Sequence, residues 1–150
     1  MLAENKTFRP KVVIDTNVFF SGLNFKGAPR EVLDLIWRGE IEVYISPFIL
    51  KELRETLEKD FDWGRERIET TIERIKKETI QVAPTIKISV IKQKEADNRI
   101  LECGVGGKVR YIVSGDKRHL LPLKEYKGIK IVSPAQFLSI IFRETSSGSF

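Results

Sequence analysis

Residues 11–17 read Lys-Val-Val-Ile-Asp-Thr-Asn, a short β-branched run that stops at an aspartate. A continuous apolar run of this length is typical of a buried parallel strand. A second run, residues 109–113, leads in the same way through Ser114 to Asp116. A carboxylate directly after a buried strand gains nothing from the core, so we expect Asp15 and Asp116 to serve a purpose other than packing.

Further strand-like runs alternate with helical patterns along the rest of the chain. Strands are predicted at 41–45, 80–82, 86–91 and 128–132, with an edge or a bulge at Pro84. Helices are predicted over 29–39, from Ser46-Pro47 through Leu57, over 68–75, over 97–103 with closure at the glycines of 104–107, and after Ser133-Pro134, with a frayed tail from Thr145. This alternation indicates an α/β fold with a mostly parallel sheet and helices on both faces.

Length and composition narrow the class of protein. The 150 residues have room for one compact domain, which we place at 1–150. A single cysteine excludes a disulfide framework, and a single histidine excludes a histidine-rich metal centre, so any metal must be held mainly by oxygen. The sequence contains no run of 18 apolar residues, so we expect no membrane span. It also has no apolar segment at the start, so we expect no secretory signal and a cytoplasmic location.

The positive charge of the chain is local. The formal net charge is +5, and residues 108–130 alone carry seven basic and two acidic residues, which accounts for all of it. A clustered basic segment is a candidate footprint for a polyanion such as RNA, although it also serves as a solubilising surface. Asp116 lies within this segment, followed by Lys117, Arg118 and His119.

Two more acids are expected at the same edge of the sheet. Asp97 lies in the first turn of its predicted helix, and Glu52 lies in the second turn of the helix that Ser46 begins. Helices that follow parallel strands start at the carboxyl edge, where ligands bind in such sheets, so Asp15, Glu52, Asp97 and Asp116 can converge on one cleft. Clustered carboxylates suit Mg²⁺ or Mn²⁺, and such a site positions and deprotonates a water and stabilises charge on a phosphoryl group.

Each of these residues also has a simpler interpretation. Asp15 and Asp116 would also serve as turn or cap residues, Asp97 as a first-turn acid favoured by the helix dipole, and Glu52 as one solvated acid among many. His119 would contact phosphate or carry a proton, but a lone histidine without a paired base is weak support for either role. Cys103 is expected in the core rather than at a reactive site.

Four motifs in order resemble those of PIN-domain nucleases: residues 12–18, 46–53, 97–101 and 111–116, with 128–138 similar to the last strand and helix of that family. The resemblance covers about 11–142. It implies a three-layer α/β/α sandwich and a Mg²⁺- or Mn²⁺-dependent ribonuclease site with acids at Asp15, Glu52, Asp97 and Asp116 and a polar rim at Asn17 and Ser114. It also implies homodimers and, for the many members that are toxins, an antitoxin partner.

One departure from the family pattern concerns the residues before Asp97. Related sequences often carry another acid there, whereas this chain has Lys94, Glu95 and Ala96. Glu95 is the candidate substitute for the missing acid. Without it, a second metal position would be weak.

We therefore expect a metal-dependent endoribonuclease in which Asp15, Asp97 and Asp116 hold the metal and Glu52 completes the catalytic set. The residues expected at the substrate are Asn17, Ser114, Lys117, Arg118 and His119. The alternative is a non-catalytic RNA-binding or regulatory module. A phosphotransfer enzyme with Asp15 as nucleophile is a third hypothesis, which the amide of Asn17 disfavours because that class usually has a second aspartate there.

Overall fold

The computed structural model describes residues 9–148, and the side chains of residues 9–144. A single sheet of six strands has the order β3-β2-β1-β4-β6-β5, and every neighbouring pair is parallel except β5 and β6. The strands are β1 (Lys11–Ile14), β2 (Glu42–Ile45), β3 (Ile80–Gln81), β4 (Tyr111–Val113), β5 (Glu125–Tyr126) and β6 (Ile129–Val132). The strand order reverses beside β1, which neighbours β4, and their carboxyl ends therefore mark the expected place for a ligand.

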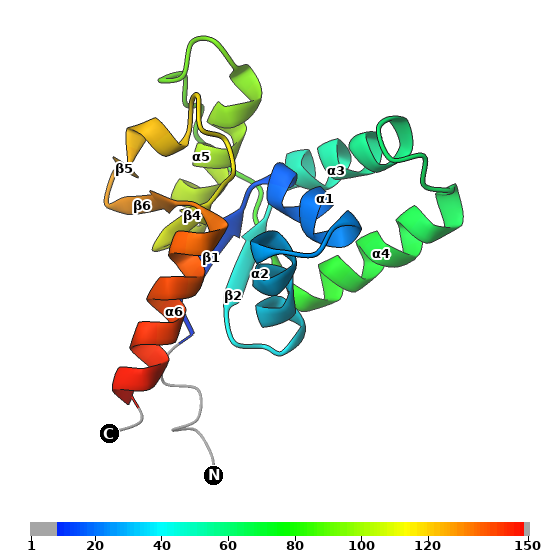
Figure 1. The fold of residues 1–150 in the computed structure, drawn as a ribbon. Helices are drawn as coiled ribbons and strands as arrows, with labels where there is room; N and C mark the ends of the chain where they lie inside the picture. The colour runs from blue at the N-terminus through cyan, green and yellow to red at the C-terminus, as the bar shows by residue number, and fades with distance from the viewer. Residues whose placement is uncertain (1–8, 149–150) are drawn as a thin grey trace.

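Helices cover both faces of the sheet, so the fold is the expected three-layer α/β/α arrangement (Figure 1). One face is covered by α5, which contacts β1, β2 and β4, and on the other face α2 packs against both α1 and α6. In Figure 1, α3 and α4 form an arm at one side of the sheet. The helices are α1 (Thr16–Asn24), α2 (Ala28–Trp37), α3 (Pro47–Lys59), α4 (Arg65–Glu78), α5 (Glu95–Gly107) and α6 (Pro134–Gly148), with a 3₁₀ turn η2 (Leu121–Leu123).

The predicted strands and helix starts follow their local signals. Val12, Val13 and Ile14 of β1 are fully buried, as a central strand covered on both faces requires. Ser46 caps α3 by accepting a hydrogen bond from the backbone N–H of Ile49 at 3.3 Å. At the start of α6, Ser133 and Gln136 cap each other's backbone N–H groups, at 2.8 and 3.1 Å.

Two expectations about secondary structure were wrong between β1 and α5. No helix was predicted at Thr16–Asn24, where α1 lies. Residues 86–91 were predicted as a strand, yet they form none. Their backbone groups bond instead to side chains of α5: Glu102 accepts from the N–H of Ile88, and Asn98 bonds both the N–H and the carbonyl of Ile91.

Two predicted helix ends were also wrong. Helix α5 continues through its glycines to Gly107, because Gly104 lies so close to β4 that an added Cβ would stand 3.0 Å from Ile112 Cδ1. Helix α6 continues to Gly148 rather than fraying from Thr145. Residues 1–8 and 149–150 lie outside the described residues. The predicted absence of a secretory signal concerns the first of these segments and therefore lies outside the described residues too. Within residues 9–148, no helix is both long and apolar enough to cross a bilayer.

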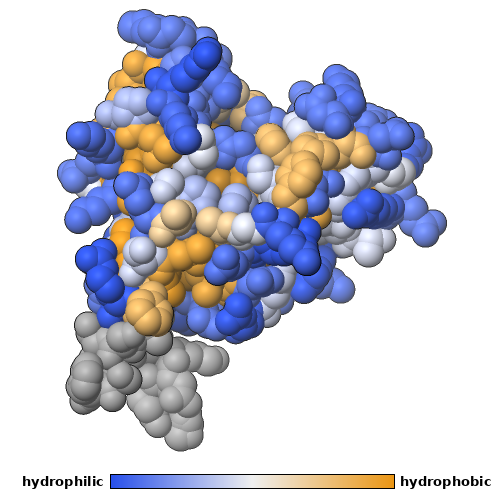
Figure 2. Space-filling view, viewed as in Figure 1, coloured by the Kyte–Doolittle hydropathy of each residue, from blue (hydrophilic) through white to orange (hydrophobic). Residues whose placement is uncertain are grey.

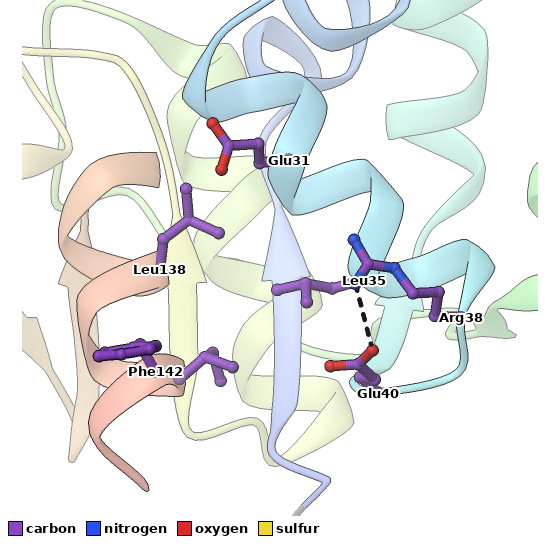
Figure 3. A pocket seen from close by; sticks show the side chains of 7 residues that line it. Glu31, Leu35, Arg38, Glu40, Leu138 and Phe142 are labelled. Atoms are coloured by element: carbon purple, nitrogen blue, oxygen red, sulfur yellow. Dashed lines mark ion pairs between the residues drawn. The ribbon is translucent and has the colours of Figure 1, made fainter. Parts of the chain in front are cut away.

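A pocket of about 340 Å³ lies between α2 and α6, away from the carboxyl ends of the strands. In Figure 3, Leu138 and Phe142 come from α6 and Leu35 reaches toward them from α2, with Glu31, Arg38 and Glu40 around them. Seen from the side used in Figure 1, hydrophobic side chains are exposed among hydrophilic ones over the lower part of the molecule (Figure 2). We call the pocket between α2 and α6, lined by Leu35, Leu138, Phe142 and their neighbours, the α2–α6 pocket.

Candidate functional site

The parallel pairing of β1 and β4 brings the ends of two distant motifs together. Ile14 pairs with Val113, and the N–H of Asp15 continues the ladder by donating to the carbonyl of Val113 at 2.9 Å. Asp15 and Ser114 therefore leave the sheet side by side. The Ser114 hydroxyl donates to Asp15 Oδ2 at 2.7 Å and accepts from the backbone N–H of Asp116 at 2.9 Å, so one buried hydroxyl joins the two motifs.

Asp15 is buried and well supplied with hydrogen bonds. The side-chain Nδ2 of Asn17 donates to the same Oδ2 at 3.2 Å, while the side-chain Oδ1 of Asn17 accepts from the backbone N–H of Gly115 at 3.1 Å. Burial, helped by the charge of Glu52 and opposed by the hydrogen bond from Ser114, raises the pKa of Asp15 to about 6. Asn17 and Ser114 thus fix the orientation of the Asp15 carboxylate through its Oδ2.

Asp97 and Asp116 form a second, less satisfied group with His119. Their side chains are only 4% and 8% exposed, and His119 Nδ1 lies 3.6 Å from Oδ2 of each. Neither of these Oδ2 atoms has a hydrogen-bond partner among the described residues. In contrast, Asp116 Oδ1 accepts from the backbone N–H groups of Arg118 and His119, at 3.0 and 3.2 Å.

The crowding of these carboxylates shifts their pKa values in opposite directions. Burial, followed by the Asp116 side chain, raises the pKa of Asp97 to about 8. Burial alone would raise the pKa of Asp116 too, but the Asp97 side chain and the two backbone N–H donors outweigh it and lower that pKa to about 2. Near neutral pH the pair therefore keeps one proton, which resides on Asp97.

Glu52 reaches the group from α3. Thr16, the first residue of α1, donates its hydroxyl to Glu52 Oε1 at 2.6 Å and is itself buried. The charge of Glu52 also acts on Asp15. Asp15, Glu52, Asp97 and Asp116 are therefore neighbours in space, and we call these four residues the acidic site.

Lys94 is a neighbour of the acidic site that the motifs did not single out. Its Nζ lies 3.9 Å from Asp97 Oδ1, and its charge lowers the pKa values of Asp15, Asp97 and Asp116. Glu95, expected to substitute for a missing acid, is exposed and pairs instead with Arg99 at 2.8 Å. The residues before Asp97 thus contribute a cation rather than an acid.

The side chains expected at the substrate occupy different positions. Asn17 and Ser114 contact Asp15, and His119 faces Asp97 and Asp116. Lys117 and Arg118 are exposed in the turn after Asp116. Of these five residues, only Lys117 and Arg118 therefore present charged side chains to solvent, where a bound polyanion would pass.

The acidic site fits a divalent cation. Two buried carboxylate oxygens without hydrogen-bond partners are costly unless a cation or a proton compensates them. Oxygen donors are what Mg²⁺ and Mn²⁺ accept, and a cation beside Asp97 and Asp116 would remove their repulsion. Asp97 and Asp116 would hold such a cation through these two oxygens, and Asp15 and Glu52 lie beside them.

Comparison with known proteins identifies the family of the chain. A PIN domain family model matches residues 11–118. The uncharacterized protein MJ1680 of Methanocaldococcus jannaschii is 35% identical over 127 residues, which cover 81% of this chain and 80% of that protein.

Solved structures show the same fold at low sequence identity. A chain of VapBC2 from Rickettsia felis, solved bound to a DNA fragment from its promoter, is 12% identical with a TM-score of 0.59, over 82% of this chain and 98% of that chain. The PIN domain endonuclease Utp24 is 24% identical with a TM-score of 0.52. The match covers 82% of this chain and 84% of that chain. PIN domains are generally nucleases that use divalent metal ions. The match across most of the chain, together with the identity to MJ1680, shows that this chain belongs to the PIN domain family.

Proposed function

We propose that the protein is a Mg²⁺- or Mn²⁺-dependent endoribonuclease of the cytoplasm, acting through the acidic site. The observation that carries this proposal is the pair of buried oxygens, Asp97 Oδ2 and Asp116 Oδ2, which lack hydrogen-bond partners among the described residues. A fold that needed these aspartates only as caps or turns would satisfy both oxygens of each. Asp116 Oδ1 already makes the turn contacts, so its Oδ2 is left for another purpose.

The roles of the chain's residues follow from their contacts. Asp15, Asp97 and Asp116 hold the cation, and Glu52, oriented by Thr16, ligates it directly or through water. Ser114 and Asn17 fix the Asp15 carboxylate, and a fixed ligand keeps the geometry of the site at little entropic cost. A bound divalent ion supplies Lewis-acid stabilisation of charge on the phosphoryl group and lowers the pKa of a water.

The substrate proposal rests on charge. Lys117 and Arg118 are exposed next to Asp116, in the segment that carries the net charge of the chain. Phosphate contacts of this kind position a strand without reading its sequence. We therefore expect Lys117 and Arg118 to add affinity for RNA but little preference for its sequence.

The partner proposal rests on the likeness to complexes. VapBC2 from Rickettsia felis and VapBC from Salmonella typhimurium share the fold, the latter at 19% identity with a TM-score of 0.58. By analogy, we infer that this chain acts as the toxin of a toxin–antitoxin pair, as a homodimer whose site an antitoxin blocks.

The test is cleavage of RNA by metal-stripped protein after addition of Mg²⁺ or Mn²⁺. Single-stranded RNA, structured RNA and DNA of the same sequence are compared, each with and without chelator. The expected result is metal-dependent RNA cleavage by the wild type and by Asp60→Asn, an exposed acid at the end of α3, but not by Asp97→Asn. Equal cleavage by Asp97→Asn would contradict the proposal. Salt-dependent RNA binding without turnover would favour a non-catalytic module.

A further inference from the structure

His119 is the one side chain at the acidic site that offers a nitrogen donor to both unsatisfied oxygens. Its Nδ1 lies 3.6 Å from Asp97 Oδ2 and 3.6 Å from Asp116 Oδ2. Those two oxygens are buried and without hydrogen-bond partners among residues 9–144, on side chains more than nine-tenths buried. One ligand atom from each of the three residues lies within 4.8 Å of the other two.

These separations suit metal ligands better than hydrogen bonds. A nitrogen–oxygen hydrogen bond spans about 2.7 to 3.2 Å, so His119 makes one with neither carboxylate. Ligands bound at about 2.1 Å to the same ion stand roughly 3 to 4 Å from one another, depending on the angle between them. The imidazole and the two carboxylates have the spacing of three ligands around one centre.

The turn after Asp116 holds the imidazole in this place. Asp116 Oδ1 accepts from the N–H of His119, and the Asp116 carbonyl accepts from the N–H of Leu121 at 3.0 Å. Leu120 is fully buried and anchors the turn to the core. Asp116 therefore uses one oxygen to build the turn and presents the other toward the side chain that the turn positions.

We propose that His119 Nδ1 is a third ligand of the divalent ion held by Asp97 and Asp116, so that the site selects Mn²⁺ over Mg²⁺. The proposal rests on the metal site of the proposed function and specifies its donor set. Mg²⁺ favours oxygen donors, whereas Mn²⁺ and the later transition metals accept imidazole nitrogen with carboxylates. The donor set remains mainly oxygen, as the sequence predicts, but gains one nitrogen, and His119 acts on the metal rather than on the substrate phosphate.

The chain offers a direct spectroscopic test because His119 is its only histidine. Tag-free wild-type protein is loaded with one equivalent of Mn²⁺, and electron spin echo envelope modulation detects ¹⁴N bound directly to the ion. Imidazole ¹⁴N coupling in the wild type, absent from His119→Ala, is the expected result. Stoichiometric Mn²⁺ binding without this coupling overturns the inference. Because this experiment needs only the wild type, a folding defect of the variant does not obscure its result.

Calorimetric titration with Mn²⁺ and with Mg²⁺ tests the selectivity. We expect His119→Ala to weaken Mn²⁺ binding about 10- to 100-fold and Mg²⁺ binding less than about 3-fold. The matched control is Lys130→Ala, an exposed side chain of β6, with both affinities unchanged. Equal losses for the two ions, or none, overturn the inference. RNA cleavage that depends on Mg²⁺ alone would leave the proposed function standing and defeat this inference by itself.

Discussion

The acidic site and the α2–α6 pocket both contain carboxylates, but the carboxylates are buried in the acidic site and exposed to water in the pocket. In the pocket, Glu40 pairs with Arg38 at 3.6 Å, and the two side chains are 46% and 61% exposed. Water solvates both charges, so the pair contributes little to stability. In the acidic site, Asp97 and Asp116 are 4% and 8% exposed, and each has a buried oxygen without a hydrogen-bond partner among the described residues.

This difference shows that a pocket alone does not make a region the better functional candidate. The pocket has an apolar lining and an exposed ion pair, which any surface between two helices can have. The acidic site keeps Asp15 and Asp97 where their charged forms destabilise the fold, and the pKa values of both are raised far above the ordinary range. A fold retains such a cost where the groups perform a function.

The largest contrast is expected in cleavage. Asp116→Asn removes one negative charge from the acidic site and should lower the RNA cleavage rate by about a thousandfold or more, because the cation loses a ligand. Glu31→Gln makes the same acid-to-amide change in the α2–α6 pocket and should leave the rate within about twofold. Single-turnover rates of the two variants check this, and equal effects would erase the distinction between the regions.

The second contrast is in stability without metal. Since the pKa of Asp15 is raised from 3.8 to about 6 in the fold, the folded state holds a proton that the unfolded chain loses, and stability falls as pH rises through that interval. The loss is about 3 kcal/mol for Asp15 by pH 7. Asp97 adds a loss of the same sign that continues to about pH 8, whereas Asp116 has the opposite effect only between about pH 2 and 4.

Asp15→Asn should therefore raise the unfolding free energy of the metal-stripped protein at pH 7.5 by up to about 3 kcal/mol and have little effect near pH 4. Urea denaturation in chelator at both pH values measures this. Glu31→Gln should change neither value. A destabilised Asp15→Asn at pH 7.5 would mean that the carboxylate stabilises the fold and that its burial needs no functional explanation.

The third contrast is the pH dependence of metal binding. The cation must displace the proton that Asp97 holds up to about pH 8, so Mn²⁺ affinity should rise about tenfold per pH unit between pH 6 and 8. Calorimetry in buffers of different ionisation enthalpy should also show proton release on binding. A constant affinity across this range would show that Asp97 does not ligate the ion.

The smallest effect is expected at Thr16. Thr16→Val keeps the shape of the side chain but removes the hydroxyl that donates to Glu52 Oε1, so Glu52 loses its orientation and cleavage should fall about tenfold. Thr16→Ser restores a hydroxyl and should recover most of the rate. An unchanged rate for Thr16→Val would remove Glu52 from the catalytic set, and failure of the serine variant would indicate a packing defect instead.

The parts of the fold that local sequence predicts are those with local causes. Strands β1 and β4 are continuous apolar runs, and Ser46 and Ser133 begin helices with their own side chains. Helix α1 escaped prediction because its aromatic residues, Ser21 and Gly22 have modest helix propensity. Packing stabilises it: a Cβ on Gly22 would stand 2.7 Å from Leu33 Cδ1, which shows how closely α1 and α2 approach.

The candidate site, too, has residues that local sequence predicts and contacts that only the folded chain creates. The positions of Asp15 and Asp116 could be predicted because Asp15 directly follows β1 and Asp116 follows β4 after Ser114 and Gly115. The contact of His119 with Asp97 and the effect of Lys94 on Asp116 could not be predicted, since both join residues far apart in the sequence. The positions of His119 and Lys94 depend on the turn after β4 and on the loop that Asn98 and Glu102 hold against α5, both of which form only when the chain folds.

Anomalous diffraction from Mn²⁺-loaded crystals tests the central claim most directly, at a pH above the pKa of Asp97. We expect an anomalous peak bound by Asp97 Oδ2 and Asp116 Oδ2, which Asp116→Asn abolishes. Density for saturating Mn²⁺ elsewhere on the molecule, with these two oxygens bare or bonded only to each other through a proton, would contradict it.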